Sequence, residues 1–423
     1  MRHLRTGHRI LWAGATASAA LALSVASCGD GPVAPEPITE LPRDLTAAEH
    51  AVVQASNTFA VSLLNQVHRA APDSTVFLSP LSASMALGMT MNGAAGGTLD
   101  QMREMLGFGS LSMSDVDASY RGLLDVLGSL DSHVEVDIAN AIFHRSTFQF
   151  EATFVDTVRT YFDAMIQGLD FANPAAVVTI NDWVKQATNN RINGIVDPPI
   201  DPQTMAFLLN AIYFKGDWTK RFDTKDTYTG PFHLVNGRTT DVRFMTKKDT
   251  LAYRATDAWQ AVELPYGGGA WVMTVAVPTQ GHSLDDVSAD LVTLLDPDAS
   301  WSKHTVVIDR PRFQLEWERV LNDDLKALGM VDAFSPVNAD FTPMFRDARE
   351  AELHVQEVKQ KTFLRVDETG TEAAAVTSVS VGVTAAPLQY VVKADRPFLL
   401  AIRERLSGTV LFAGYIVQAP TSP

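Results

Sequence analysis

The residue types that carry most enzyme chemistry are present in this sequence, but they are not spaced as a catalytic or metal-binding site. The ten histidines include no HExxH pair, the serines include no GxSxG motif, and no two acids are spaced for acid–base work. Cys28 is the only cysteine and lies at the end of an export signal, which leaves none for a Cys/His dyad. His354, beside Leu353, is interpreted as a strand-face residue. We therefore expect no catalytic residue, no metal site and no cofactor, and we predict that the protein is not an enzyme.

The segment Asp367–Gly382, DETGTEAAAVTSVSVG, has an ambivalent pattern. Its three consecutive alanines favour helix, whereas its Thr, Val and Ser residues favour strand. As a strand it would place Thr371, Ala373, Ala375 and Thr377 on one face, where all are small or β-branched and fit between packed neighbours. No proline interrupts it. The pattern therefore suits a strand that lies between packed neighbours. A flexible linker between two lobes is the alternative, but it does not explain the small side chains on one face.

Residues 1–27 have the pattern of a secretory signal. Arg2, Arg5 and Arg9 form a basic start without any acid, and a run of small apolar residues follows. The residues VAS directly before Cys28 resemble the bacterial lipoprotein signal, which implies lipidation of Cys28 after cleavage. A plain signal peptide with an incidental cysteine is the alternative. Residues 28–46 are rich in proline and glycine and are expected to form an extended tether. The resemblance implies an exported, membrane-anchored lipoprotein, periplasmic or at the cell surface and extracellular.

The overall charge and composition limit the partners of the protein. The formal net charge is -15, so the chain lacks the excess of Lys and Arg that nucleic acid or anionic lipid would require. We expect no nucleic-acid partner, and contact with a membrane only through the N-terminal lipid. Hydrophobic residues make up 46% of the chain, which allows a large core, and a single cysteine allows no internal disulfide.

Helical patterns dominate the first half of the chain and strand patterns the second. Apolar residues recur at helical spacing through 45–71, and Pro80 begins another helix with Ser79 as its cap. The apolar run TMAFLLNAIYFKGDW, residues 204–218, is expected to be a central strand covered on both faces. Three glycines at 267–269 join two strand patterns and predict a hairpin turn. These patterns predict one α+β domain with large antiparallel or mixed sheets.

Six stretches of the chain resemble the serpin family and occur in that family's order. ETGTEAAAVTS is similar to the serpin hinge, and VKADRPFLLAI to the signature that follows the reactive loop. The other four stretches are STVFLSPLSASMALGMTMNGAAGGT, LLNAIYFKGDWTKRFD, VELPYGGGAWVMTVAVP and GMVDAFSPVNADFTPM. The resemblance implies the serpin fold over residues 47–420, with three β-sheets, eight or nine helices and an exposed reactive-centre loop at about 368–390.

The resemblance also implies a suicide-type inhibitor of serine proteases. In that family the protease cleaves the loop and forms a covalent acyl complex, and the cleaved loop then inserts into the central sheet and traps the protease. The implied hinge consists of Glu368, Gly370, Thr371, Glu372, Ala373, Ala374 and Ala375. The implied sheet-opening region consists of Ser79, Ser82, Asn210, Trp218 and Gln360.

Gln360 departs from the family pattern. Serpins often have a histidine at this place, which hydrogen-bonds an asparagine matching Asn210 and controls the opening of the sheet. His354 lies six residues earlier and does not match that histidine. An amide can both donate and accept hydrogen bonds, so we expect Gln360 to replace the histidine without its pH response.

The reactive bond is placed by counting along the resemblance. About 16 residues past Glu368, as in the family, the bond falls between Thr384 and Ala385, whereas counting back from the following signature gives positions from Val383 to Ala386. The side chains here are small, and no Arg or Lys is near. These residues fit the small S1 pocket of an elastase-like or subtilisin-like protease.

The implied partner is a target serine protease, bound as a covalent acyl complex by a monomeric inhibitor. Two alternatives stay open, namely a non-inhibitory serpin-fold surface binding protein and an inhibitor of cysteine proteases. Non-inhibitory members tend to carry bulky residues or proline in the hinge, which this chain lacks. Residues 107–125, where some members carry a basic glycosaminoglycan site, are acidic here, so no heparin-type activator is expected.

Overall fold

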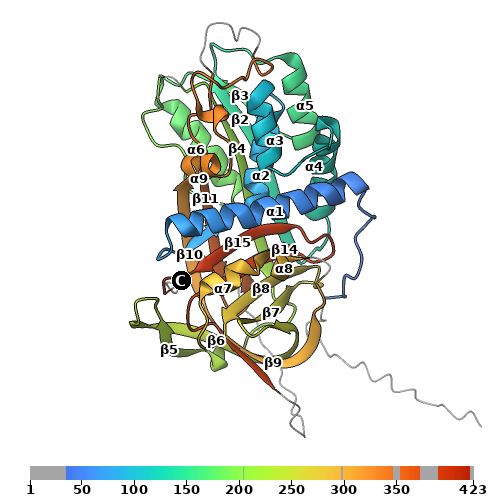
Figure 1. Ribbon diagram of the computed structural model, residues 1–423, viewed down its shortest axis with the longest axis vertical. Coiled ribbons are helices and arrows are strands. Elements are labelled where there is room, and N and C mark those ends of the chain that lie inside the picture. The colour runs from blue at the N-terminus through green and yellow to red at the C-terminus, as the bar shows by residue number, and fades with distance from the viewer. Residues whose placement is uncertain (1–34, 203, 297–298, 346–352, 372–388, 420–423) are drawn as a thin grey trace, which may run out of the picture. The chain divides into compact units, whose positions relative to one another are not determined.

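The computed structural model describes residues 35–202, 204–296, 299–345, 353–371 and 389–419 (Figure 1). The predicted signal peptide lies outside these residues, and so do several of the predicted site residues. Those site residues are Cys28, Glu372, Ala373, Ala374, Ala375, Thr384 and Ala385.

Nine α-helices occur in the described residues, and their starts follow from local sequence. α1 (Ala47–Ala70) begins with a capping box, in which Thr46 Oγ1 accepts from Glu49 N and Glu49 accepts from Thr46 N. α2 (Pro80–Met91) begins at the predicted proline, and Ser79 Oγ accepts from Ser82 N at 3.4 Å. The other helices are α3 (Gly96–Met105), α4 (Met113–Gly128), α5 (Ala152–Phe162), α6 (Ala175–Ala187), α7 (Leu284–Ala289), α8 (Leu291–Leu295) and α9 (Asn322–Ala327).

The strands of the described residues form two hydrogen-bonded sheets. The six-stranded sheet has the order β10 (Phe313–Val320), β11 (Lys359–Val366), β12 (Gly370–Thr371), β4 (Ala206–Asp217), β2 (Val134–Arg145) and β3 (Met165–Leu169). The nine-stranded sheet has the order β1 (Val76–Leu78), β15 (Val410–Ile416), β14 (Phe398–Glu404), β8 (Trp271–Pro278), β7 (Trp259–Tyr266), β6 (Thr239–Ala255), β9 (Ser302–Pro311) and β13 (Tyr390–Lys393), with β5 (Tyr228–His233) paired to β6.

The serpin fold implied by the sequence is observed, with two of its three sheets joined by hydrogen bonds. β6 is 17 residues long and pairs with three different strands. Its first residues pair with β5, its last four with β7, and residues 244–253 with β9. Because one long strand belongs to two groups of strands, those groups form a single nine-stranded sheet.

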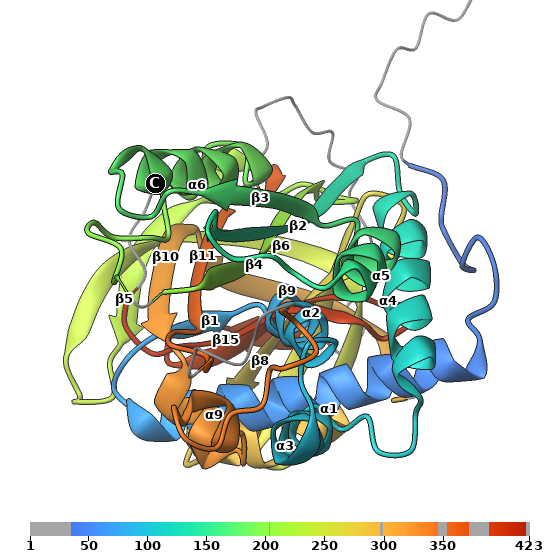
Figure 2. The same ribbon diagram turned by 90° about the horizontal axis from the view of Figure 1, so that it is seen from above.

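The predicted central strand lies in the middle of the six-stranded sheet as β4. Figure 2 shows β10 and β11 in orange on one side of it and β2 and β3 in green on the other. β4 pairs with β2 along all but its last residue, from Ala206 opposite His144 to Gly216 opposite Val134. The half of β4 nearest Asp217 is mostly buried, as predicted, but residues 206–210 are only partly buried. The reason is an opening on the other side of the strand, described below.

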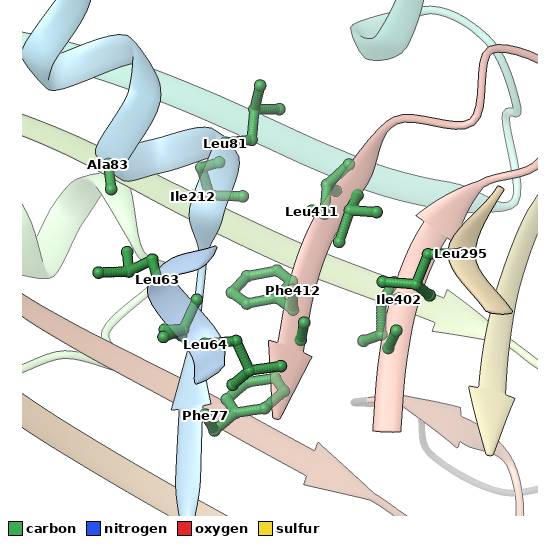
Figure 3. Packing of buried hydrophobic residues seen from close by; sticks show 14 of the residues in the cluster. Leu63, Leu64, Phe77, Leu81, Ala83, Ile212, Leu295, Ile402, Leu411 and Phe412 are labelled. Carbon is green, nitrogen blue, oxygen red and sulfur yellow. The ribbon is translucent and has the colours of Figure 1, made fainter. Parts of the chain in front are cut away.

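The hydrophobic core joins the first helices to the last strands of the chain. Figure 3 shows Leu63 and Leu64 of α1 beside Phe77 of β1 and Phe412 of β15. The rings of Phe77 and Phe412 are stacked with their centroids 5.4 Å apart, and both side chains are buried. Since the chain has one cysteine, this packing holds the domain together without an internal disulfide.

Residues 35–46, which we call the strap, lie against the domain. The sequence predicted an extended tether over 28–46, and this expectation does not hold for the strap. Leu45 is buried, and Ile38 and Leu41 pack on the hydrophobic core. The strap docks because its apolar side chains find a surface to cover, in spite of the prolines around them.

Two kinds of feature are absent from the part of the chain that the structure describes. None of its helices combines the length and apolar character needed to cross a membrane. No three His, Cys, Asp or Glu residues of this part are grouped so that they could hold a metal ion.

Asp117 on α4 is expected to make the stability of the protein depend on pH. Its side chain is 3% exposed and accepts a 2.8 Å hydrogen bond from Asn92 Nδ2. Burial raises the pKa of Asp117 to about 6, whereas the unfolded carboxyl titrates near ~3.9. The folded protein therefore holds this proton more tightly, and its free energy of unfolding falls by about 3 kcal/mol as the pH rises from about 4 to 6. We expect Asp117→Asn, which keeps the acceptor for Asn92, to be up to about 3 kcal/mol more stable at pH 7 and similar to wild type at pH 4. Urea unfolding at pH 4, 5, 6 and 7 checks this, and parallel pH curves for the two proteins would contradict it.

Candidate functional site

The predicted hinge begins as a short strand inside the six-stranded sheet. β12 lies between β11 and β4, with Thr371 paired to Val366 on one side and to Gly216 on the other. Within the described residues, β4 and β11 do not pair with each other and are joined only through β12. Beyond Thr371 the facing edges of these two strands have no strand partner in the described part of the chain.

A tight turn leads from β11 into the hinge. Asp367 N donates to Gly370 O at 3.0 Å, and Thr369 N donates to Asp367 Oδ1 at 3.0 Å. A Cβ atom at Gly370 would lie 2.1 Å from Gly216 O and 2.7 Å from Asp217 Cα. Only glycine fits here, because the backbone of the hinge passes directly over the backbone of β4.

Thr371 is fixed by a stack of aromatic side chains. It is 1% exposed, and its Oγ1 lies 2.7 Å from the hydroxyl of Tyr266. Burial raises the pKa of Tyr266, which keeps the hydroxyl protonated. The Tyr266 ring is stacked on Trp218 with centroids 4.3 Å apart, and Trp218 Nε1 donates to Asp367 O at 2.9 Å. The residues Asp367–Thr371, Trp218 and Tyr266 form what we call the hinge entrance.

Glu368 is held on three sides at the hinge entrance. Its Oε1 accepts a 2.7 Å hydrogen bond from Thr227 Oγ1 and lies 3.4 Å from Arg312 Nη1. Its backbone oxygen accepts from Phe222 N at 2.9 Å. The carboxylate is buried, and a buried charge of this kind is stable only when it is paired and hydrogen-bonded.

Four of the five predicted sheet-opening residues lie together, and we call them the central cluster. Gln360 Oε1 accepts from Ser79 N at 3.0 Å, and Gln360 Nε2 donates to Ser79 O at 2.7 Å. Ser82 Oγ donates to the backbone oxygen of Asn210 at 3.2 Å. Trp218 does not join this cluster and lies at the hinge entrance instead. It follows Asn210 by eight residues, which is roughly 27 Å along an extended strand.

The partner of Gln360 differs from the expected one. We expected Gln360 to replace a histidine that bonds the asparagine matching Asn210, but both polar atoms of Gln360 bind the backbone of Ser79. An amide presents its donor and acceptor side by side, which matches the N–H and C=O of one residue. Asn210 Nδ2 instead donates to Asn140 Oδ1 at 2.7 Å. Asn210 Oδ1 is buried without a hydrogen-bond partner among the described residues.

A cavity of about 580 Å³ runs between the open edges of β4 and β11, and we call it the slot. The unpaired backbone N–H and C=O groups of two strand edges line such a space and can bind an extended chain between them. The slot is lined by residues 206–212 of β4, residues 359–362 of β11, and Ser79, Ser82, Ala83, Ala86 and Leu87 of α2 and its cap.

Gln360→Glu tests the link between the central cluster and Ser79 with almost no change in shape. Glutamate has no N–H to donate to Ser79 O, and its carboxylate would be buried at a site that is 8% exposed. Burial raises the pKa of such a carboxyl, so the variant resembles wild type where the glutamate is neutral and loses stability as the pH rises through that pKa. At pH 7.5 we expect a loss of about 2–4 kcal/mol. Thermal midpoints at pH 4.5 and 7.5, each compared with wild type and with the exposed-site control Gln418→Glu, check this. A deficit of equal size at both pH values would contradict it.

Sequence reasoning missed two residues that hold the site together. Tyr266 stands directly before the three glycines of the predicted hairpin, and nothing in the sequence linked that turn to the hinge. Asn140 lies in VEVDIANAIFHR, residues 134–145, a stretch whose alternation is typical of a strand, and it is 3% exposed. A polar residue at an inward position of a strand indicates a buried hydrogen bond, so Asn140 could have been singled out.

The architecture and the site agree with comparisons to known proteins. The family described as Serpin (serine protease inhibitor) matches residues 54–419. Neuroserpin from Gallus gallus is 33% identical over 373 residues, which cover 85% of this chain and 90% of that protein. The structure of human thyroxine-binding globulin superposes with a TM-score of 0.80 at 27% identity, covering 89% of this chain and 100% of that one. Tengpin, a thermophilic serpin in its native state, superposes with a TM-score of 0.78 at 28% identity, covering 92% and 98%. Because the family match, the relative and the fold all span most of the sequence, the chain belongs to the serpin family.

Proposed function

We propose that the protein is a suicide-type inhibitor of serine proteases, which traps the acyl-enzyme by inserting its cleaved loop into the slot. One observation carries this proposal. The hinge already forms two residues of a strand between β4 and β11, while the edges beyond it are unpaired within the described residues. An inhibitor of this type needs a vacant strand position and a segment that fits it. The small and β-branched residues after Thr371 supply such a segment.

Continuing the register of β12 gives a position to each residue of the inserting segment. From the pairings of Thr371, an antiparallel continuation puts Thr377 opposite Asn210 of β4 and Gln360 of β11. Thr377 would share the inward face with Thr371, because alternate residues of a strand point the same way. Its hydroxyl would then reach Asn210 Oδ1, a buried acceptor that has no partner among the described residues. Insertion would thus complete the hydrogen bonding of the central cluster.

Charge complementarity also supports insertion in this register. It concerns the face of the inserting strand opposite to the one that carries Thr371 and Thr377. Glu372 would come to lie opposite Lys215 of β4 and Arg365 of β11. Opposite charges on directly paired strand positions are favourable by roughly 0.2–1 kcal/mol each. The only acid among the first residues to insert therefore arrives between two cations.

The protease carries out the bond cleavage. The inhibitor supplies the peptide bond that is cleaved and the loop segment that then inserts. The serine hydroxyl of the protease attacks the carbonyl carbon of Thr384, and the bond to the nitrogen of Ala385 breaks. The proton of the hydroxyl ends on the new amino group of Ala385, and an ester joins the protease to Thr384. Trapping requires that the segment enters the slot before water hydrolyses this ester. The rate of insertion, rather than affinity, decides whether the protein inhibits or is consumed.

A panel of purified proteases tests the proposal. The protein should form complexes with elastase-like or subtilisin-like enzymes that survive denaturing gels, since an ester links the two chains. Complexes with cysteine proteases in place of serine proteases would move the assignment to the other class of target. Complete absence of such complexes across both classes would refute inhibition.

A binding function without insertion is the second candidate, because a structural neighbour is thyroxine-binding globulin in complex with thyroxine. The thermal midpoint, measured before and after loop cleavage, distinguishes the inhibitory from the binding function. If the cleaved loop enters the slot, cleavage should raise the thermal midpoint by tens of degrees, as many new hydrogen bonds and contacts form. A protein whose loop does not insert should show almost no change on cleavage.

For location, we propose that residues 1–27 are removed and that Cys28 carries the lipid that anchors the protein outside the cytoplasm. The basic start, the small apolar run and the position of the single cysteine support this. We expect Cys28→Ala to shift the protein from the membrane fraction to the soluble fraction after export, because the variant has no residue to lipidate. Fractionation followed by mass spectrometry of the N-terminal peptide checks this. A wild-type protein as soluble as the variant would rule out the anchor.

A further inference from the structure

The strap is joined to the turn between β7 and β8 by backbone hydrogen bonds and close packing. Ile38 N donates to Gly268 O at 2.8 Å. Arg405 links the two segments, since its Nη2 donates to Ile38 O at 3.3 Å and its Nε donates to Gly269 O at 3.2 Å. A Cβ atom at Gly268 would lie 2.6 Å from Glu36 O and 2.8 Å from Ile38 Cγ1. The docked strap therefore leaves no room for any side chain at Gly268.

The other side of the same turn holds the end of β4. Gly267 N donates to Asp217 O at 2.9 Å, and Thr219 Oγ1 donates to Gly267 O at 2.6 Å. Gly268 N donates to the buried carboxylate of Asp131 at 2.7 Å, just before β2 begins. The turn of residues 267–269 thus lies between the strap and the end of β4.

The end of β4 in turn holds the hinge. Asp217 pairs with Gly370, and Trp218 N donates to Thr369 O at 2.9 Å. Tyr266, which binds the hydroxyl of Thr371, is the residue directly before the turn. A continuous set of hydrogen bonds therefore runs from Ile38 through the turn to the hinge entrance.

The strap is also fixed at its other end, independently of the turn. Arg43 donates to both carboxylate oxygens of Glu49, at 2.6 and 2.8 Å, and to Gly122 O of α4 at 3.3 Å. These bonds lower the pKa of Glu49, which stays charged. The strap is thus held to α1 and α4 at one end and to the turn at the other.

We infer that the strap is a positioning element for insertion, which keeps the hinge entrance in the geometry from which the loop enters the slot. This inference rests on the proposed inhibitory function. Insertion competes with hydrolysis of the ester. A hinge that is already ordered raises the rate of insertion, because less conformational entropy is lost in that step. Releasing the strap loosens the turn, the end of β4 and then the hinge, and more of the protease escapes.

Ile38→Asp tests the inference, with Thr39→Asp as the matched control. The first variant places a carboxylate at a partly buried residue packed on the core, and the second places the same charge on the exposed neighbour. Hydrogen exchange in the uncleaved protein should show protection of the amides of Trp218, Phe222 and Asp367 reduced about tenfold in Ile38→Asp and unchanged in Thr39→Asp. The number of inhibitor molecules consumed per trapped protease should rise about threefold or more in Ile38→Asp alone.

Gly268→Ala displaces the strap through a change in the turn of residues 267–269 and leaves the strap's own sequence unchanged. Its added methyl group meets the strap backbone and Ile38, so it should reproduce both effects of Ile38→Asp. In a protein that lacks residues 35–42 the same substitution should have no further effect, because nothing is left to displace. A full effect of Gly268→Ala in the shortened protein would show that the turn acts without the strap and would overturn the inference.

The two readouts separate this inference from the proposed function. If wild type traps no protease, inhibition fails, yet exchange of the amides of Trp218, Phe222 and Asp367 still tests the coupling between the strap and the hinge entrance. If trapping is efficient but neither readout changes in Ile38→Asp and Gly268→Ala, the strap does not position the hinge.

Discussion

Replacing Thr371 by arginine is expected to convert the protein from an inhibitor into a substrate of its target protease. Thr371 is 1% exposed and bonded to Tyr266, so the longer side chain of arginine has no space there. It would also bring a second cation near Arg310, whose guanidinium lies 5.7 Å from the Trp218 ring centroid. Arg310 is itself fully buried, and its Nε and Nη2 have no hydrogen-bond partner among the described residues. An unpaired charge at such a site costs several kcal/mol, so the arginine is expected to leave its position between β4 and β11. Returning it there during insertion then slows insertion by about 100-fold or more.

The product distribution on a denaturing gel measures this effect. With wild type the target protease should appear mainly in a covalent complex, whereas Thr371→Arg should yield cleaved inhibitor and free, active protease. Thr371→Ser is the control, because it keeps the hydroxyl for Tyr266 and should still trap the protease. An equal yield of complex from the arginine variant would remove loop insertion from the mechanism proposed above.

The fold could be predicted well from local patterns, because its main elements have strong ones. The helix expected over 45–71 is α1, the run expected at 204–218 is β4, and the three glycines at 267–269 form the hairpin turn. The joining of two sheets could not be predicted, since it depends on which partners β6 finds along its 17 residues. The docking of the strap was missed for a related reason. Its prolines indicate an extended chain, but they do not show whether a surface lies beside that chain.

The site was predictable where glycine or a small residue is required by close packing. Gly370 and Thr371 were expected at the hinge, and the structure places both between β4 and β11. The partner of Gln360 was not predictable, because a side-chain amide can bind another side chain or a backbone with the same atoms. The hydrogen bonds that connect Asp217 through the turn to Ile38 could not be predicted either. They join segments far apart in the chain through backbone groups, which do not depend on residue type.

Replacing Thr384 by arginine is expected to add inhibition of trypsin-like proteases, which wild type should not inhibit. The S1 pocket of these enzymes contains an acid that pairs with a cationic side chain, and the chain has no Arg or Lys between Arg365 and Lys393. Discrimination by size alone is worth about 1–3 kcal/mol, so wild type should inhibit several small-pocket enzymes at graded rates. The new charge should raise the rate of complex formation with trypsin by about 100-fold or more and lower that with elastase. Rates of complex formation with the two enzymes measure the change, and mass spectrometry of the released C-terminal fragment should show Ala385 as its first residue. A cut outside Val383–Pro387 would refute the placement of the bond even if inhibition is found.

Combining both substitutions separates recognition from trapping. Thr384→Arg changes only what the protease binds, whereas Thr371→Arg acts at the hinge entrance, 13 residues earlier in the chain. The double variant should therefore be cleaved by trypsin as fast as Thr384→Arg, because the S1 contact is the same in both. It should form almost no complex, because the ester is hydrolysed before the loop can enter the slot. If the double variant instead resists cleavage, the hinge also controls how the loop is presented to the protease, and the two steps are not independent.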